Sequence, residues 1–390
     1  MDASVDVRKE RDAVLDAWRG VGIVGVLLQH FVYFRYDDVF RTFSYAVPTS
    51  AVGHFFVWLD KLFIAVSVRA GEYGVESFFI ISGYIITTLL LLEEDKAGTI
   101  NVRSFYFRRV FRILPAYLFY VACIVLFGAL GWITMDYAQL PAALGFLCNT
   151  SLGICDWNLT HTWTLATEEQ FYILWPLLFI LVPRKHRAAF IAFLIGLFLG
   201  LSMTGLLFAH GWTDNGRSFV CISLGVLVAL LPSFRIAMHK YAFYVSLGML
   251  ALFGALDFMP GLSGLSHLLF RESTPLFILT AILLTYRIPK SFHSTRFAVL
   301  LSQLGLMSYS VYLWQEVFTN DPASYAAHSP FSTPVLLVPL ILLSYFAVER
   351  PMMRWSKAYL KKDNWFSRLR NLPYQARGDA AHYGAGGNVL

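Results

Sequence analysis

Long apolar segments alternate with short charged segments along most of the 390-residue chain. A helix needs about 20 mainly apolar residues to cross the hydrocarbon core of a bilayer. Ten segments are predicted as membrane-spanning helices, at about residues 14–34, 74–92, 110–133, 161–183, 188–209, 217–232, 241–258, 273–287, 298–318 and 333–349. The expected fold is therefore all-α, a polytopic integral membrane helical bundle with about ten transmembrane helices.

The charged residues predict how this bundle is oriented. An even number of spans places both termini on one side, and most of the 31 lysines and arginines fall on that same side. Because cytoplasmic loops carry the excess of basic residues, both termini are expected to be cytoplasmic. The formal net charge of +6 then reflects membrane orientation, and we expect no nucleic-acid partner.

Composition agrees with a membrane protein and adds a domain boundary. The chain is 57% hydrophobic and only 14% charged, unlike an ordinary soluble domain. Residues 1–360 are expected to form one membrane domain. The polar segment 361–390 has few core-forming residues, which predicts a disordered cytoplasmic tail. The longest external segment, 35–73, is a candidate lid or acceptor-binding element.

The first predicted helix carries two residues that are unusual in a membrane span, Arg19 and His30. Eleven residues turn a helix by about 1100°, close to three full turns, and raise it by about 16.5 Å. Both side chains therefore share a face, with Arg19 near the inner end and His30 in the outer third. They either extend to the two membrane interfaces or contribute to one functional site inside the bundle.

Three arginines precede the third predicted span in the segment "FYFRRVFRILPAY". Arg108, Arg109 and Arg112 lie within about 100° of one helical face. Guanidinium groups bind phosphate in a bidentate manner, so the cluster suits a polyanion at the cytoplasmic surface. An ordinary positive anchor is the alternative interpretation.

The fourth predicted span, "HTWTLATEEQFYILWPLLF", contains His161 and the adjacent carboxylates Glu168 and Glu169. A charged side chain near the bilayer centre costs about 2.5–3.5 kcal/mol even on a lenient scale. These carboxylates must therefore meet cations, hydrogen-bond donors or water, or be partly protonated. They are the strongest indication of a functional site in the chain.

Several further polar residues can line such a site. Glu76 lies at the outer end of the second span, where Ser82 follows it in "GVESFFIISGYIIT", and Tyr309 lies in the ninth span within "MSYSVYLWQEVF". An interfacial carboxylate with a solvated head group is the alternative for Glu76. Two cysteines, Cys148 and Cys155, fall in a predicted external loop, where they can form a disulfide or stay free.

These motifs, taken in order, resemble the membrane acyltransferase-3 family of O-acyltransferases. The segments that carry the resemblance are "LDAWRGVGIVGVLLQHF", "GVESFFIISGYIIT", "FRRVFRILPAY", "HTWTLATEEQFYILWPLL", "SYSVYLW" and "VERP", which span roughly residues 14–353. The resemblance implies a multi-helix enzyme of the bacterial inner membrane. Such an enzyme moves acetyl or other short acyl groups from cytoplasmic acyl-CoA to hydroxyls of glycans, glycolipids or natural products.

The resemblance also implies roles for individual residues. His30 matches the essential histidine of the family, Arg19 its partner arginine, and Arg109 and Arg112 the paired arginines that are attributed to donor binding. This chain departs from the pattern at Gln315, where many members carry a histidine after "YLW". We therefore expect no chemical role for Gln315.

A mechanism follows from this spacing. Coenzyme A has a polyanionic end and a long arm that ends in the reactive carbonyl, so its site needs cations at one depth and chemistry at another. Our hypothesis is that His30 removes the proton of the acceptor hydroxyl, with Glu168 or Glu169 orienting it. Transient acylation of His30 is a variant. No metal is expected to take part.

Other functions stay open at this stage. The expected acceptor is a hydroxyl of a cell-surface or secreted glycan, and a hydroxylated natural product such as a macrolide sugar is the alternative. A small-molecule transporter is the rival class, although no pair of interrupted spans suggests inverted repeats. A sensor that binds acyl-CoA without turnover is a third possibility.

Overall fold

The structure is a computed structural model that describes residues 12–31, 51–150, 153–203, 213–257, 263–319, 331 and 334–362. The described residues form helices and turns, with no β-strand among them. The all-α prediction is therefore confirmed. Of the predicted tail, residues 361–362 end the last helix and residues 363–390 lie outside the described part.

The long helices follow one another with short connections. They are α1 (Ala13–Phe31), α3 (Ala51–Ala97), α4 (Val102–Ala129), α7 (Trp163–Leu181), α8 (Arg187–Met203), α9 (Thr213–Leu230), α10 (Pro232–Asp257), α11 (Ser263–Thr285), α13 (Arg296–Thr319) and α15 (Arg350–Lys362). Shorter helices are η2 (Tyr137–Gln139), α5 (Leu140–Leu144), α6 (Trp157–Thr160), η3 (Arg184–His186), α12 (Lys290–His293), η7 (Pro334–Leu336) and α14 (Leu337–Leu343), and a π-helical segment η8 (Ser344–Glu349) joins α14 to α15.

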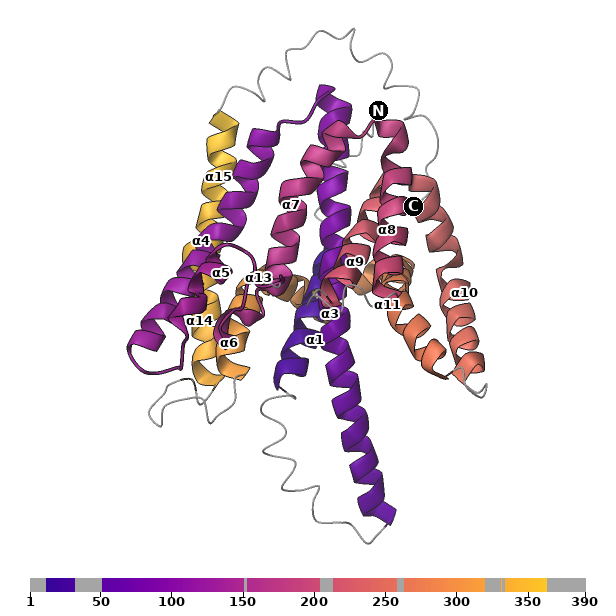
Figure 1. Ribbon diagram of the computed structural model, residues 1–390, viewed down its shortest axis with the longest axis horizontal. Coiled ribbons are helices and arrows are strands. Elements are labelled where there is room, and N and C mark those ends of the chain that lie inside the picture. The colour runs from indigo at the N-terminus through magenta and orange to yellow at the C-terminus, as the bar shows by residue number, and fades with distance from the viewer. Residues whose placement is uncertain are drawn as a thin grey trace.

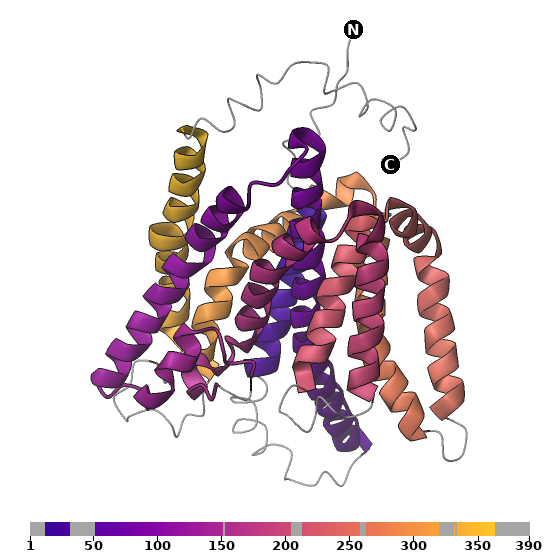
Figure 2. The ribbon, with the colours of Figure 1, turned by 45° about the horizontal axis from the view of Figure 1, so that its top comes forward.

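The helices run alternately up and down through an elongated bundle (Figure 1). The end of α3, the start of α4 and the end of α15 lie on one side, and α5 and α6 lie on the other (Figure 2). Helix α1 packs against α3 on one side and against α13 on the other, and α3 also packs against α9. These four helices bring the candidate site together.

Three helices in the described part are long and apolar enough to cross a membrane: Leu62–Ala97, Val102–Ala129 and Arg296–Thr319. The bent pair Gly216–Leu230 and Pro232–Met249 makes a fourth if it counts as one span. All ten predicted segments overlap described helices, so the helices were located correctly. The number of membrane crossings and the position of the termini stay predictions.

The predicted loop 35–73 differs from the structure. Residues 32–50 lie outside the described part, but from Ala51 onward the chain is already helical and continues without a break into the second predicted span. No proline interrupts this stretch, which removes the strongest signal for a helix end. The first turns of α3 extend past the rest of the bundle (Figure 1).

Glycines allow the central helices to approach at backbone distance. A Cβ atom on Gly74 of α3 would lie 2.3 Å from the carbonyl oxygen of Gly22 in α1, and one on Gly305 of α13 would lie 1.8 Å from the carbonyl oxygen of Asp16. Small residues at such crossings are typical of packed membrane helices. The contacts hold α1, with Arg19 and His30, between α3 and α13.

Candidate active site

A cavity of about 420 Å³ lies where α1 and α13 end and α7 and α9 begin. All of these helix ends belong to the same side of the bundle as α5 and α6 (Figure 2). The lining is Val26, Gln29, His30, Glu72, Val75, Glu76, Phe79, Trp157, Thr160, His161, Trp163, Thr164, Arg217, Ser218, Tyr312 and Glu316. His30, His161 and Glu76 are sequence-predicted residues that the fold brings together here.

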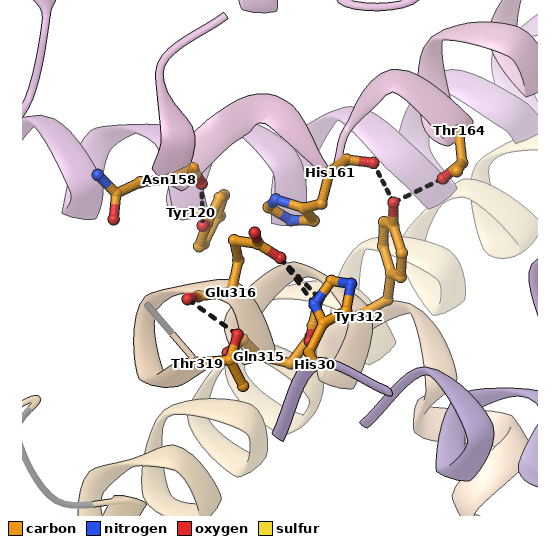
Figure 3. Close-up of polar contacts among 9 residues, drawn as sticks. All are labelled: His30, Tyr120, Asn158, His161, Thr164, Tyr312, Gln315, Glu316 and Thr319. Carbon is orange, nitrogen blue, oxygen red and sulfur yellow. Dashed lines mark hydrogen bonds and ion pairs between the residues drawn. The ribbon is translucent and has the colours of Figure 1, made fainter. Parts of the chain in front are cut away.

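His30 contacts a carboxylate in this cavity. Its Nδ1 lies 3.0 Å from Oε2 of Glu316, which is 2% exposed, while 22% of the histidine side chain is exposed. The same carboxylate oxygen accepts a hydrogen bond of 3.0 Å from Nε2 of Gln315. Figure 3 shows Glu316 and Gln315 of α13 facing the end of α1. An imidazole that donates a hydrogen bond through Nδ1 carries its basic lone pair on Nε2.

The carboxylate that contacts His30 is thus neither of the two considered from the sequence. Glu168 and Glu169 lie on α7, whereas Glu316 comes from the last turns of α13. The sequence did contain a signal, because a carboxylate inside an apolar span is costly wherever it occurs. Which of several such carboxylates meets His30 depends on helix packing, which no spacing within one helix reveals.

His161 stands on the other side of Glu316 (Figure 3). It is 4% exposed, and its ring lies between those of Tyr120 and Tyr312, with centroid distances of 5.8 and 5.2 Å. Neither ring nitrogen has a hydrogen-bond partner among the described residues. The backbone is held instead, because the Tyr312 hydroxyl donates to the His161 carbonyl and lies 2.6 Å from Thr164 Oγ1. His161 is thus fixed through its backbone, and its buried ring lines the cavity beside Glu316.

Glu76 forms the adjacent wall of the cavity. It makes an ion pair with Arg217 of α9, a residue that the sequence analysis did not single out. Only 6% of the Glu76 side chain and 14% of the Arg217 side chain are exposed. The packing of α9 on α3 buries Arg217 beside Glu76.

A second polar cluster lies around Arg19, about 16.5 Å along α1 from His30 by helical rise. Arg112, Glu168 and Asp16 are within electrostatic reach of Arg19. Glu168 accepts hydrogen bonds from Ser82 at 2.6 Å and from Tyr172 at 3.1 Å. The cluster therefore combines guanidinium groups with a carboxylate that is itself hydrogen-bonded.

Arg109 belongs to the same cluster, and Arg108 does not. The Arg109 guanidinium lies 4.9 Å from the ring centroid of Tyr172 and is within electrostatic reach of Glu168 and Glu169. Arg108 forms an ion pair of 3.4 Å with Glu93 near the end of α3. Of the three arginines that share a helical face, Arg109 and Arg112 therefore belong to the candidate donor site. Arg108 forms an ordinary ion pair with Glu93.

The remaining predicted residues border this second cluster. The Tyr309 hydroxyl donates to the carbonyl of Ile113 at 3.0 Å, so it ties α13 to α4. Glu169 has a buried Oε1 atom without a hydrogen-bond partner in the described part of the chain. Glu349 of η8 is buried and accepts a 2.6 Å hydrogen bond from Ser310.

A disulfide joins Cys148 and Cys155, which settles the alternative left open by the sequence. The loop it closes precedes the cavity residues Trp157 and His161. Asn149, inside this loop, donates to Thr167 and Gln170 of α7 at 3.1 and 2.9 Å. The loop is thus fastened to the helix that carries Glu168. Over the described residues, no group of three or more His, Cys, Asp or Glu side chains is placed to hold a metal ion.

Comparison with known proteins supplies relatives with a named activity. The chain is 30% identical over 350 residues to a protein of Staphylococcus aureus (strain MRSA252) named "Putative O-acetyltransferase", with 77% of this chain and 55% of the relative covered. It is 28% identical over 348 residues to O-acetyltransferase OatA of the same strain, covering 77% and 56%. The chain therefore spans about half the length of the curated relatives it matches.

No solved structure matches the chain, so the family rests on sequence. A family model described as an acyltransferase domain matches residues 12–348, nearly all of the described helices. The match includes α1 with Arg19 and His30, α4 with Arg109, and α13 with Glu316. The chain belongs to the acyltransferase-3 family.

Proposed function

We propose that the protein is a membrane O-acyltransferase that moves an acetyl or other short acyl group from cytoplasmic acyl-CoA to a hydroxyl of a cell-surface or secreted glycan. The observation that carries this proposal is the pair of His30 and Glu316, 3.0 Å apart in a cavity. A histidine supported by a buried carboxylate is an arrangement that can act as the general base in acyl transfer to an alcohol.

The proposed donor site is the cluster of Arg19, Arg109 and Arg112. Their guanidinium groups supply the positive charge that coenzyme A phosphates require. The pantetheine arm would have to span the rise of about 16.5 Å between Arg19 and His30 to join one cluster to the other. Arg108 is left out because it already pairs with Glu93.

In the proposed reaction neutral His30 donates a hydrogen bond from its Nδ1–H to the Glu316 carboxylate and uses Nε2 as a base. The acceptor hydroxyl gives its proton to Nε2 as its oxygen attacks the thioester carbonyl. The tetrahedral intermediate then collapses, the carbon–sulfur bond breaks, and the departing thiolate takes the proton from His30. Glu316 stabilises the charged imidazolium between these two steps. Glu168 and Glu169, considered from the sequence as the partners of His30, are assigned to the donor cluster instead.

The two clusters are proposed to face opposite sides of the bacterial inner membrane. The excess of Lys and Arg favours a cytoplasmic position for the side with the end of α3 and the start of α4. The cavity lies at the other side, where the Cys148–Cys155 disulfide is compatible with an oxidising compartment. Donor and acceptor would then approach from different sides.

A glycan acceptor is supported by the lining of the cavity. Trp157 and Trp163 line it together with a few polar groups, which is the usual make-up of a small-molecule site. A hydroxylated natural product is the second candidate, since the same lining suits any polyhydroxylated ring. The names of the relatives favour an O-acetyltransferase over a transporter.

The proposal is tested with purified protein in nanodiscs and radiolabelled acetyl-CoA, without any acceptor. We expect binding and slow hydrolysis by the wild type. His30→Ala is expected to bind acetyl-CoA and to lose hydrolysis by at least about 100-fold, the typical contribution of a general base. The double variant Arg109→Ala/Arg112→Ala is expected to lose binding.

Matched controls separate these effects from general damage. Arg103→Ala removes an exposed arginine from the first turn of α4, and His186→Ala removes an exposed histidine from η3; both are expected to behave like the wild type. Well-folded wild type that binds neither acetyl-CoA nor longer acyl-CoAs would refute the proposal and favour the transporter. Binding without any turnover would favour the sensor.

A further inference from the structure

The cavity that holds His30 has a second charged wall that the acyl-transfer step does not use. Glu76 of α3 and Arg217 of α9 form an ion pair there, and both residues line the cavity. Glu76 lies on the face of α3 that continues toward Phe79, and Arg217 lies in the first turns of α9. Two helices therefore present one negative and one positive group to the same space.

The protein satisfies only part of the hydrogen-bonding capacity of this ion pair. Glu76 Oε2 and Arg217 Nε are buried and have no hydrogen-bond partner among the described residues. Native proteins keep few buried polar atoms in this condition, because each one loses its hydration without compensation. A buried ion pair is in addition a weak source of stability. A ligand that supplies the missing partners would account for both atoms.

The two atoms define what that ligand must offer. Glu76 Oε2 can only accept a hydrogen bond, and Arg217 Nε–H can only donate one. A ligand that satisfies both must therefore present a hydrogen-bond donor next to an acceptor. Two adjacent hydroxyl groups fit, since one donates to Glu76 and its neighbour accepts from Arg217. A single hydroxyl also donates and accepts, but it must reach both atoms from one oxygen position, whereas two adjacent hydroxyls engage each atom separately. An anionic ligand would gain from Arg217 and be repelled by Glu76.

The rest of the lining fits a sugar ring. Trp157 and Trp163 offer apolar ring faces in the same cavity, against which the C–H face of a pyranose can pack. His30 and Glu316 lie in the cavity as well. A ring held by two neighbouring hydroxyls can place a further hydroxyl near the base.

We propose that Glu76 and Arg217 form an acceptor subsite that binds the vicinal diol of a neutral pyranose and presents another hydroxyl of that sugar to His30. This inference rests on the proposed function, because it assumes acyl transfer at His30. It adds the chemical class that the acceptor must have, a sugar with two adjacent free hydroxyls beside the one that is acylated.

The test uses the full-length protein in nanodiscs with acetyl-CoA as donor. Release of coenzyme A is measured without acceptor, with a panel of p-nitrophenyl pyranosides, and with deoxy counterparts that lack one of two adjacent hydroxyls. We expect pyranosides to be acetylated, and the deoxy counterparts of the best one to have at least tenfold lower kcat/KM. In Glu76→Gln and Arg217→Gln, the ratio of transfer to hydrolysis is expected to fall at least tenfold.

Two further variants guard against a purely structural effect. Arg217→Lys keeps a positive charge beside Glu76 but lacks the Nε–H donor, and it is expected to show the same fall in the ratio. Arg184→Gln breaks the exposed Arg184–Asp95 ion pair at the other end of α3 and is expected to leave the ratio unchanged.

The outcomes are distinguishable. Parallel loss of hydrolysis and transfer in the Glu76 and Arg217 variants would make the pair structural and overturn the inference. An unchanged ratio, deoxy sugars that react equally well, or a wild type that hydrolyses acetyl-CoA but acetylates no pyranoside would overturn it too. A wild type that does not hydrolyse acetyl-CoA at all would refute the proposed function, and the subsite with it.

Discussion

At the scale of single residues, the site depends on His30 and the carboxylate beside it. His30 could be found from the sequence because a histidine in an apolar helix, on the face of an arginine, is unusual. The carboxylate that pairs with His30 could not be identified in this way. Glu168, Glu169 and Glu316 all occupy apolar segments, and only the packing of α13 on α1 brings Glu316 within 3.0 Å of the imidazole.

A first prediction concerns Glu316. The Glu316→Gln variant keeps the size of the side chain but lacks the charge that stabilises the imidazolium. We expect kcat for acyl transfer to fall about 10²- to 10⁴-fold, with the KM for acetyl-CoA within about twofold of wild type because the arginine cluster is untouched. Steady-state kinetics at saturating acceptor measures both constants.

The control for this prediction is Glu93→Gln, which removes a carboxylate that pairs with Arg108 near the end of α3. It is expected to keep both constants close to those of the wild type. A Glu316→Gln enzyme with full kcat would show that His30 works without the carboxylate. A large rise in KM alone would assign Glu316 to substrate binding.

At the scale of helices, close backbone contacts set the geometry of the site. Gly83 of α3 would place a Cβ atom 2.1 Å from the carbonyl oxygen of Ile222, and Gly225 of α9 would place one 2.0 Å from that of Ile80. Small residues near Ser82 were a visible sequence signal for such packing. The sequence did not indicate which helix packs against this surface, because every other span is apolar and could pack against the same glycine.

A second prediction concerns Gly305, at the crossing of α13 and α1. A Cβ atom there would lie 1.8 Å from the carbonyl oxygen of Asp16, so Gly305→Leu must push the helices apart. We expect unfolding free energy to fall by about 1–3 kcal/mol, as for other overpacked sites. Transfer activity is expected to fall as well, because the same helices carry His30 and Glu316. Thermal unfolding in detergent and transfer assays measure the two effects.

Gly200 of α8 provides the comparison, because nothing lies within 4 Å of a Cβ atom built there. Gly200→Ala is expected to leave activity unchanged and stability unchanged or slightly higher, since alanine favours a helix by about 0.5–1 kcal/mol over glycine. If Gly305→Leu were as stable and active as Gly200→Ala, the close contact would have no role in positioning the site.

At the scale of the whole molecule, the separation of the arginine cluster from the cavity implies two-sided access. A third prediction tests this with cysteine labelling. Arg103→Cys replaces an exposed residue at the start of α4, and Tyr137→Cys replaces one in η2, on the side of the cavity. In spheroplasts, a membrane-impermeant maleimide is expected to label Tyr137→Cys and to label Arg103→Cys only after the membrane is opened.

Wild type is the control here. Cys221 is buried and Cys148 and Cys155 are joined in a disulfide, so its labelling measures the background from Cys123, which is free and half-buried. Labelling of both variants, or of neither, in intact spheroplasts would contradict the proposed sidedness. The reverse pattern would place both termini outside.

The sequence by itself determined the all-helical fold, the places of its long helices and the family, because hydrophobic length and local motifs act within one segment. It also located Arg19, His30, Arg109 and Glu168 as residues too costly to bury without a purpose. Tertiary structure decided which of these meet: His30 with Glu316, Arg217 with Glu76, and Glu168 with the arginines. The physical reason is that the spacing of residues within one helix determines which side chains share a face. Which other helix packs against that face depends on how closely the two backbones can approach.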